Sequence, residues 1–521
     1  MFENFFAFSE TSIHWVDVSL IIAYMAGITV FGYFFGKRIK TSSDYFLAGR
    51  SLPWWIIGMS IIGTNIGSND YVGAAGGAYR IGIAQANFEW IGAIPAMILS
   101  AFIFIPFYWR AGVFSIPEYL GKRYSDAVRV ISAVILTLFS IIIVGVFLWA
   151  TALMLQTYLG WPVYFSILVT AAVVGFYTIS GGLGAVAITD SIQLVIMFTG
   201  AIAVAVLGIS EAGGLDHFIA TIQAEHPSHL KAFLPADHEF FPWPGVILGL
   251  GMVLSPAYWC TNQAILQRTL GARSEWDGRA SMMLAAIAKT FVPFLIVLPG
   301  LLALTMVQGG LDNQDQALPW VIKNILPVGL SGLMFVAFIA ALQSSIDSTM
   351  NSASVMITRD IIGVLAGRGA HELRDLKLGK IFTFMVLIIG IFCAPLTAKF
   401  EGIYVFVQFT LSLFQGPMLA LILLGILSKK MTAKAGLYSL VIGVSTSLIM
   451  GLPSLLTSLG FTAAAQAAGG WNINMLYIAF WSFIISVTSL IIISSFTTPK
   501  TEQELVNLTY SKTVPEVLSH D

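Results

Sequence analysis

The chain carries the polar run Ala340-Ala341-Leu342-Gln343-Ser344-Ser345-Ile346-Asp347-Ser348-Thr349-Met350-Asn351-Ser352 in the middle of a long apolar segment. Ala341 is followed by serines three, four and seven positions later, so a helix places these residues on one face. Hydroxyl groups inside a membrane span are costly unless something there needs oxygen ligands. A hard cation such as Na⁺ has this need, because oxygen atoms are its preferred ligands. The run therefore predicts an ion-coupled membrane transporter.

The composition is that of an integral membrane protein. Of 521 residues, 57% are apolar and 10% are charged, against about 25% charged in soluble domains. The apolar runs are about 20 residues long, enough to cross roughly 30 Å of hydrocarbon. The net charge is −1, without a polybasic block, so nucleic acid is excluded as a partner and the lipid bilayer is expected. Cys260 and Cys393 both lie in apolar segments and predict neither a disulfide framework nor a metal cluster.

The apolar segments predict an all-α polytopic protein with about 13 transmembrane helices. Residues 1–496 form the membrane domain, and 497–521 a short, polar, mobile tail. Every second loop is basic, which places the N-terminus outside and the C-terminus in the cytoplasm of a cell membrane. The basic residues are Lys37, Arg38, Lys40, Arg50, Arg110, Lys122, Arg123, Arg268, Arg273, Arg279, Arg359, Arg368, Arg374, Lys377, Lys380, Lys429, Lys430 and Lys434.

Two predicted spans contain helix breaks. The second holds Gly63-Thr64-Asn65-Ile66-Gly67-Ser68-Asn69-Asp70, where glycines and polar residues make a continuous helix unfavourable. The seventh holds Pro256, which removes a backbone hydrogen bond. Interrupted helices in membranes are typical of binding sites, because they free backbone carbonyls. The breaks lie five spans apart, and an odd offset inverts topology. We therefore expect inverted repeats at about 53–208 and 246–427 with the site between them.

The span after each break carries an isolated charge, Glu89 in the third span and Lys289 in the eighth. Lys289 lies eight residues into its span, or about 12 Å deep at 1.5 Å per residue. Snorkelling of the lysine to the membrane surface is the alternative, but the distance is long for one side chain. We expect Lys289 to have a functional role.

The chain resembles the sodium:solute symporter family, and within it the sodium/glucose cotransporter branch. The resemblance covers about residues 16 to 450. It rests on the motifs Ser42-Ser43-Asp44-Tyr45-Phe46-Leu47-Ala48-Gly49-Arg50, Gly181-Gly182-Leu183-Gly184-Ala185-Val186, Thr189-Asp190-Ser191-Ile192-Gln193, Pro242-Trp243-Pro244-Gly245, Tyr258-Trp259-Cys260-Thr261-Asn262-Gln263 and Gln267-Arg268-Thr269-Leu270, together with the serine run. The family has the leucine-transporter fold of two inverted five-helix repeats, so the resemblance implies this fold here.

The resemblance also implies a sodium site and a sugar site. The backbone carbonyls of Gly63, Ile66 and Ala341 and the hydroxyls of Ser344 and Ser345 match the family's Na⁺ ligands. The positions that match sugar contacts are Asn65, Phe88, Glu89, Ser255, Tyr258 and Lys289, with Tyr258 closing the inner side of the site.

This chain departs from the sugar branch at two positions. Asp70 stands where the branch usually has Gln or His, which adds a negative charge at a substrate position. Gln408 is one residue out of register with the branch's sugar-binding glutamine near Gln415. Glucose is therefore open as the solute, and a related polyol or sugar derivative is the alternative.

A second sodium site is a further hypothesis. The position that matches Asp190 helps to form a second site in some family members, with hydroxyls matching Ser345 and Ser348. Asp347 also lies inside a span, where a carboxylate needs a partner. It points about 100° away from Ser348 on a helix and has an Arg or Lys of an inner loop as an alternative partner.

The predicted function is sodium-driven import of a monosaccharide or related polyol by alternating access. The alternative within transport is another small solute, such as an amino acid, a carboxylate or sialic acid. A membrane sensor is the alternative from a different functional class, but the tail after residue 497 is too short for a signalling domain. No Ser/His/Asp order or HExxH motif indicates an enzyme.

Overall fold

The computed structural model of the protein describes residues 14–36, 40–67, 69–367, 371–400 and 402–509. In these ranges almost all regular structure is helical, and the β pairing is an isolated bridge between Leu52 and Ala272. Four residues named in the sequence analysis lie outside the described residues: Lys37, Arg38 and Arg368 of the basic loops and Ser68 of the polar break.

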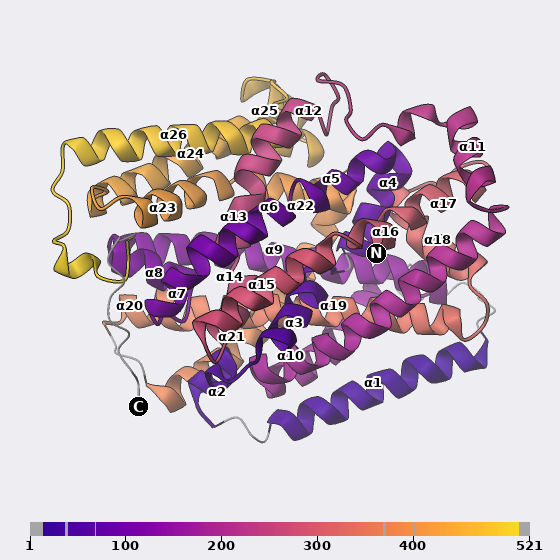
Figure 1. Ribbon diagram of the computed structural model, residues 1–521, viewed down its shortest axis with the longest axis horizontal. Helices are drawn as coiled ribbons and strands as arrows, with labels where there is room; N and C mark the ends of the chain where they lie inside the picture. The colour runs from indigo at the N-terminus through magenta and orange to yellow at the C-terminus, as the bar shows by residue number, and fades with distance from the viewer. Residues whose placement is uncertain (1–13, 37–39, 68, 368–370, 401, 510–521) are drawn as a thin grey trace.

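In Figure 1 most long helices run along the long axis of the molecule. The elements of the first half are α1 (Trp15–Gly36), α2 (Ser42–Leu47), η2 (Ala48–Arg50), α3 (Trp54–Asn65), η3 (Asn69–Ala74), α4 (Ala75–Ile81), η4 (Gly82–Ala86), α5 (Asn87–Trp90), α6 (Ile94–Leu99), η5 (Ser100–Phe104), α7 (Ile105–Arg110), α8 (Ile116–Arg123), α9 (Asp126–Leu159), α10 (Val163–Glu211), α11 (Leu215–Glu225) and η6 (Pro227–Leu230).

The second half begins after residue 240. Its elements are α12 (Trp243–Gly245), η7 (Val246–Leu254), α13 (Ser255–Thr261), α14 (Gln263–Leu270), α15 (Glu275–Lys289), α16 (Val292–Ile296), α17 (Leu298–Met306), η8 (Gln314–Gln316), α18 (Ala317–Ile325), α19 (Leu330–Val355), η9 (Met356–Ile362), α20 (Gly363–Leu365), α21 (Glu372–Cys393), η10 (Ala394–Lys399), α22 (Ile403–Ser412), α23 (Gln415–Leu427), α24 (Ala433–Ser458), α25 (Thr462–Ala467), α26 (Met475–Ser495) and η11 (Gln503–Leu505).

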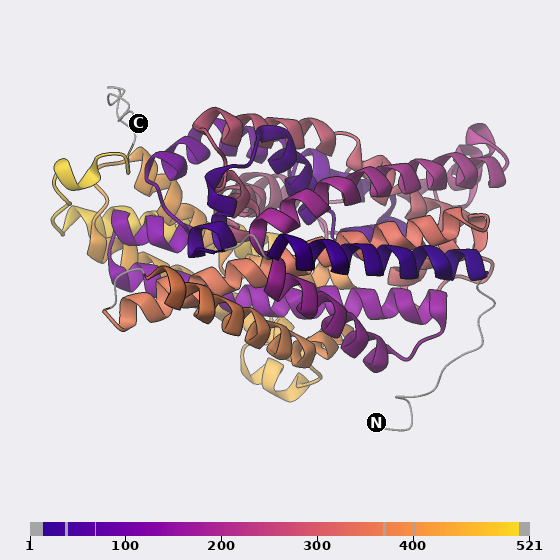
Figure 2. The ribbon, with the colours of Figure 1, turned by 90° about the horizontal axis from the view of Figure 1, so that it is seen from below.

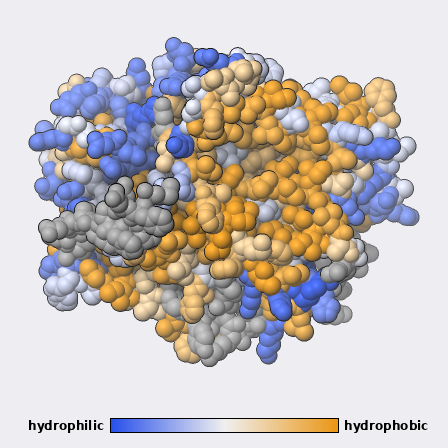
Figure 3. All heavy atoms as spheres, turned by 180° about the vertical axis from the view of Figure 1, so that it is seen from behind, coloured by the Kyte–Doolittle hydropathy of each residue, from blue (hydrophilic) through white to orange (hydrophobic). Residues whose placement is uncertain are grey.

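The surface and the helix lengths are those of a multi-pass membrane protein. Figure 3 shows hydrophobic atoms over the middle of one face, with hydrophilic atoms gathered mostly toward the two ends of the long axis. Among the described residues, eight helices are long and apolar enough to cross a membrane, and two bent pairs raise this number to ten. The predicted number of about 13 spans stays a prediction.

The first predicted break is confirmed. Helix α3 ends at Asn65, and Ile66 takes non-helical angles (φ −80°, ψ 71°) before the π-helical segment η3 starts at Asn69. Glycine and short polar residues favour such an interruption because they lose little by leaving the helix. The chain therefore exposes carbonyl groups at this level of the bundle.

The second break was predicted at Pro256, but the chain leaves the helix six residues later, at Asn262. Pro256 lies inside a helix that continues from Trp243 to Thr261, and the π-helical turns of η7 directly before it accommodate its missing N–H. The helix stops at Thr261, and Asn262 adopts extended angles (φ −68°, ψ 115°). Its side chain then accepts a hydrogen bond of 2.9 Å from the Ala264 N–H and so caps the N-terminus of α14.

Element α10 covers two predicted spans, 162–179 and 186–208. Its two parts nevertheless run along α19 in opposite directions. In the first part, Val169 and Thr170 line a cavity with Phe335 and Ile339 of α19, and Thr178 then donates to Asp347. In the second part, Asp190 and Ser348 both bond to Arg268, and Gly200 then packs on Met334 at the other end of α19. The chain thus reverses between the two parts, and two antiparallel spans are retained.

Helix α19, which carries the serine run, is the buried centre of the bundle. Nearly all of its residues are buried, and α1, α3, α9, α10 and α21 pack against it. Seen from below in Figure 2, α1 lies along the outside of the bundle. A helix with hydroxyls on one face is thus enclosed by other helices rather than exposed to lipid, as expected for polar residues in a membrane.

The first part of the polar tail is not free, contrary to the prediction that it is mobile. Leu505 and Leu508 are buried, and the Tyr119 hydroxyl donates a hydrogen bond of 2.6 Å to the Leu508 carbonyl. Lys500 donates to the Lys122 carbonyl at 2.7 Å. Residues 510–521 lie outside the described residues.

Asp315 joins a loop to helix α22. It lies in η8, between α17 and α18 and outside the candidate spans, and its Oδ2 accepts a hydrogen bond of 3.0 Å from the Ile403 N–H. Its Oδ1 is buried and has no hydrogen-bond partner within the part of the chain that the structure describes. Burial raises the pKa of Asp315 to about 7. The folded protein therefore favours the neutral carboxyl, and stability is lost as the pH rises through this pKa.

We expect the melting temperature of the purified protein to fall between pH 5.5 and 8.5, and Asp315→Asn to make this fall smaller, because the amide carries no charge at either pH. A fluorescence melt across the pH range measures the effect. Asp312→Asn, at an exposed position of the same loop, is the control and should keep the wild-type profile. Identical profiles for wild type and Asp315→Asn would contradict the prediction.

Candidate functional site

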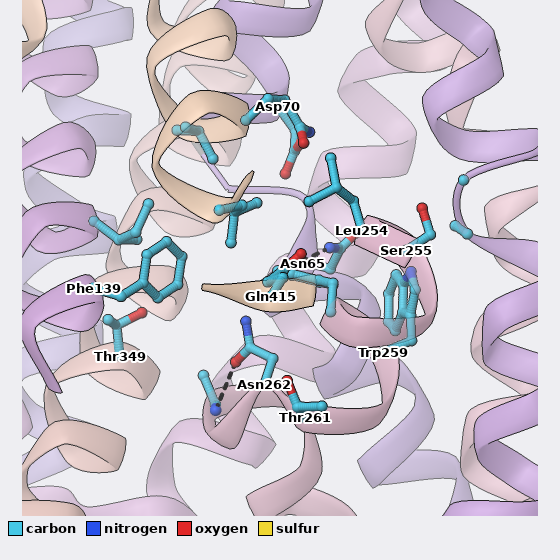
Figure 4. Close-up of a pocket in the computed structure, with 18 of the residues that line it drawn as sticks. Asn65, Asp70, Phe139, Leu254, Ser255, Trp259, Thr261, Asn262, Thr349 and Gln415 are labelled. Carbon is cyan, nitrogen blue, oxygen red and sulfur yellow. Dashed lines mark hydrogen bonds between the residues drawn. The ribbon is translucent and has the colours of Figure 1, made fainter. Parts of the chain in front are cut away.

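A cavity lies between the two broken helices, α9, α19 and α22; we call it the central cavity. In Figure 4, Asn65 and Gln415 lie near its middle, with Phe139 and Thr349 on one side and Ser255 and Trp259 on the other. All eight substrate residues predicted from the sequence line it. They are Asn65, Asp70, Phe88, Glu89, Ser255, Tyr258, Lys289 and Gln408.

Glu89 and Lys289 form a buried ion pair in the wall of the cavity. The Lys289 ammonium donates to Glu89 Oε2, and both residues are at most 5% exposed. The ammonium also lies 5.9 Å from the ring centre of Trp259. Lys289 therefore does not snorkel to the membrane surface. Each charge compensates the other in a place where either one alone would be costly.

The break in the first span presents two further polar residues to the cavity. Asn65 Nδ2 donates to the Tyr258 hydroxyl at 3.3 Å, which joins the two broken helices. Asp70 Oδ2 accepts from the Gly67 N–H at 3.3 Å, within the break itself. The cavity thus contains two carboxylates, from Asp70 and Glu89, and one ammonium.

Aromatic rings pack against the same cavity. Phe88 meets Phe241 and Tyr404 edge to face, with ring centres 4.8 Å apart in both pairs. Tyr404 was not predicted from the sequence, and only its position four residues before Gln408 on α22 hints at it. Gln408 and Gln415 both line the cavity.

Tyr258 does not mark an end of the cavity, although it was predicted to close the inner side. The lining continues past it to Asn262, Gln263 and Ala264, and along α9 and α19 to Leu136 and Met356. These residues lie in the half of the bundle where the loops predicted to be inner are found. The cavity therefore extends in this direction beyond the predicted substrate residues.

Three of the five predicted sodium ligands, Ala341, Ser344 and Ser345, lie where α19 faces the broken end of α3. The Ser345 hydroxyl lies 2.9 Å from the Thr64 carbonyl and 3.0 Å from the Ala341 carbonyl. Ser344 Oγ lies 3.2 Å from the Thr64 hydroxyl. Gly63 and Ile66, the other two, lie within two residues of Thr64 at the end of α3. The geometry brings carbonyl and hydroxyl oxygens together, and such a set suits a small hard cation.

Thr64 was missed as a site residue, although it lies in the polar break. Its hydroxyl is 3.3 Å from Ser348 Oγ and 3.3 Å from Asp190 Oδ2. It therefore connects the predicted sodium ligands to the residues of the second predicted site.

Asp190 and Ser348, two of the three residues predicted for a second sodium, contact an arginine. Arg268 Nη2 lies 3.0 Å from Asp190 Oδ2 and also donates to Ser348 Oγ. The prediction that Arg268 lies in a basic loop is wrong. The short helix α14 carries it into the bundle, where it is 0% exposed. Asp347 accepts a hydrogen bond from Thr178 of α10.

With this geometry established, comparison with known proteins identifies the family. The model of the sodium:solute symporter family matches residues 45–443. The chain belongs to the sodium:solute symporter family. A sodium/glucose cotransporter of Vibrio parahaemolyticus is 32% identical over 468 residues, covering 85% of this chain and 86% of that protein. Sodium/glucose cotransporter 1 of Oryctolagus cuniculus is 30% identical over 544 residues, covering 95% and 81%.

Solved structures support the fold. The substrate-bound, outward-open structure of a Na⁺-coupled sialic acid symporter matches with a TM-score of 0.81 at 22% identity, covering 94% of this chain and 100% of that one. A nucleobase-cation-symport-1 family transporter matches with a TM-score of 0.54 at 14% identity, covering 89% and 98%. The predicted leucine-transporter fold is confirmed.

Replacing Lys289 alone should destabilise this family member strongly. Lys289→Met leaves Glu89 buried without its counter-charge, which costs about 3–5 kcal/mol. The double variant Glu89→Gln/Lys289→Met removes both charges and should recover most of the loss. Thermal unfolding of the purified proteins in detergent measures both effects. If Lys289→Met melts at the wild-type temperature, the pair does not stabilise the bundle.

Proposed function

We propose that this protein is a Na⁺-coupled symporter that imports a neutral monosaccharide or related polyol by alternating access. One observation carries the proposal: consecutive residues at the broken end of α3 serve both candidate sites. Thr64 contacts the serine face of α19, while Asn65 lines the central cavity and bonds to Tyr258. Binding of Na⁺ at Gly63, Ile66, Ala341, Ser344 and Ser345 would therefore fix the backbone that presents Asn65 to the solute.

The lining of the cavity supports a neutral polyhydroxylated solute. Glu89 accepts and Lys289 donates hydrogen bonds, and the amides of Asn65 and Gln408 do both. The Gln408 Oε1 has no hydrogen-bond partner among the described residues, so it is available to a hydroxyl group. Apolar ring surfaces of Phe88 and Tyr404 suit the C–H face of a sugar. The two relatives named above are sodium/glucose cotransporters.

An anionic solute such as a carboxylate or sialic acid is the alternative, and the charges of the cavity disfavour it. Lys289 is already paired with Glu89, and Asp70 adds a second carboxylate without a second ammonium among the lining residues. An anion would therefore meet net negative charge in a cavity of low dielectric constant.

The driving force would be Na⁺ entry. One charge moving down 100 mV provides about 2.3 kcal/mol, which corresponds to a roughly 50-fold solute gradient before the Na⁺ concentration ratio is added. Import requires the N-terminus outside and the C-terminus in the cytoplasm, as the basic loops predict. The two inverted repeats, at about 53–208 and 246–427, would move relative to each other around the site.

The direct test is uptake of labelled solutes into vesicles containing the purified chain. The solutes compared are glucose, galactose, myo-inositol, proline and sialic acid. Each is measured with Na⁺ or K⁺ outside the vesicles and with an inside-negative or zero membrane potential. We expect uptake of a neutral sugar or polyol only with Na⁺, increased by an inside-negative potential. Equal uptake in both media would overturn sodium coupling. Na⁺-dependent uptake of proline or sialic acid alone would overturn the solute class.

Ser345→Ala should raise the Na⁺ concentration for half-maximal uptake at least roughly tenfold, the effect of losing about 1.4 kcal/mol. The reason is the loss of a hydroxyl ligand at the end of α3. Ser354→Ala is the matched control: it lies on the same helix, is equally buried, and bonds to the Gly379 carbonyl instead. A wild-type Na⁺ dependence in Ser345→Ala would show that the serine face serves only helix packing.

A further inference from the structure

Arg268 is an unusual residue for the interior of a membrane protein. It is 0% exposed, and its guanidinium joins four helices. Nε donates to Ser60 Oγ of α3 at 2.6 Å, and Nη2 to Asp190 of α10 at 3.0 Å and to Ser348 of α19. Nη1 donates a hydrogen bond to the Ala264 carbonyl of its own helix, α14. One cation thus connects α3 and α14, a part of each broken helix, to α10 and α19.

Only one of the two carboxylate oxygens of Asp190, the partner of Arg268, accepts hydrogen bonds from described residues. Asp190 Oδ2 accepts from Ser60, Thr64 and Arg268. Its Oδ1 is buried and has no hydrogen-bond partner among the described residues. A purely structural pair in such a place usually engages both oxygens, because an unpaired buried oxygen is costly. An unused carboxylate oxygen is instead a coordination position for a cation.

These oxygens continue directly from the candidate sodium site. The Thr64 hydroxyl lies 3.2 Å from Ser344 Oγ, 3.3 Å from Ser348 Oγ and 3.3 Å from Asp190 Oδ2. A Na⁺ that leaves the serine face therefore meets Thr64, Ser348 and Asp190 without leaving an oxygen-lined path. The guanidinium of Arg268 stands at the end of this path.

We propose that Arg268 is a tethered cation that competes with Na⁺ for Asp190 and Ser348. The inference rests on the proposed sodium coupling. With the guanidinium in place, Asp190 keeps a counter-charge in the absence of Na⁺, and α14 is held to α3, α10 and α19. Na⁺ arriving at Asp190 displaces the guanidinium and frees α14 from these three helices. Arg268 thus couples the passage of the ion to the position of the second broken helix.

The first test removes the competitor. In Arg268→Gln, no guanidinium competes with Na⁺ for Asp190. The Na⁺ concentration for half-saturation should therefore fall by roughly 5- to 150-fold, the usual range of coupling between two sites. Adding Asp190→Asn should cancel this gain. The measurement is equilibrium binding of ²²Na⁺ to the purified full-length chain. An unchanged or weaker Na⁺ affinity in folded Arg268→Gln would overturn the proposal.

Arg123 offers a matched control. It is also 0% exposed, but it donates to the carbonyls of Gly425, Ser428 and Met431 and forms no ion pair with a carboxylate of the described residues. Arg123→Gln should lower stability and leave Na⁺ affinity unchanged. Wild-type protein that binds no Na⁺ would refute the proposed function itself, which separates that failure from a failure of the Arg268 account.

The second test needs no variant and so does not depend on whether Arg268→Gln folds. Phenylglyoxal reacts with accessible arginines, and mass spectrometry locates the modified residues. In the wild-type chain, Na⁺ should increase modification of Arg268 relative to K⁺, because the displaced guanidinium leaves its partners. Arg123 is the internal reference and should react equally in both salts. Unchanged or reduced modification of Arg268 in Na⁺ would overturn the proposal.

Discussion

Inside a bilayer, every backbone carbonyl must have a partner, and this constraint governs the architecture of the protein. Helix α3 stops at Asn65 in the interior of the bundle, so its last carbonyls cannot be satisfied by the next turn. The hydroxyl of Ser345 on α19 meets one of them, at Thr64. A buried helix with hydroxyls on one face is therefore needed beside the break, and the packing of α19 at the centre of the molecule provides it.

Buried ion pairs form the other framework of the interior, and three of those in the described residues join helices distant in sequence. Glu89 pairs with Lys289, and Asp190 with Arg268. The carboxylate of Asp360 pairs with Arg129 at 2.8 Å. Removing one member of such a pair leaves an uncompensated charge, so the pairs define where the helices must meet even when they add little net stability. Two of the three lie at the candidate sites, where movement of a helix would change the partners of a charge.

The features predicted correctly are those with a local physical cause. The serine spacing gives a polar face on any helix, and the glycines around Thr64 weaken any helix that contains them. The features missed depend on packing. Pro256 predicted a break, but the helix from Trp243 to Thr261 continues through it, with π-helical turns before the proline, and the break falls at Asn262. Arg268 follows an apolar segment and was counted with the loops. Only the direction of α14 shows that it points into the bundle.

The eight predicted substrate residues come together although they are separated by up to 343 positions, from Asn65 to Gln408. Their choice rested on family resemblance, because periodicity cannot say which face of one helix meets which face of another. Asp70 and Glu89 show the limit of sequence reasoning in the other direction. Glu89 was marked by its isolated charge and Asp70 by its position in the family pattern, but only the structure distinguishes the carboxylate that is paired with Lys289 from the one bonded within the break.

The central claim is that Na⁺ binds at the broken end of α3 and orders it. Hydrogen exchange of the backbone amides between Ile62 and Val72, compared in Na⁺ and in K⁺ at equal ionic strength, tests this claim most directly. The account predicts slower exchange in this segment with Na⁺, while the amides of α24, which lies away from the site, exchange equally in both salts. Equal exchange of the segment in Na⁺ and K⁺ would contradict it.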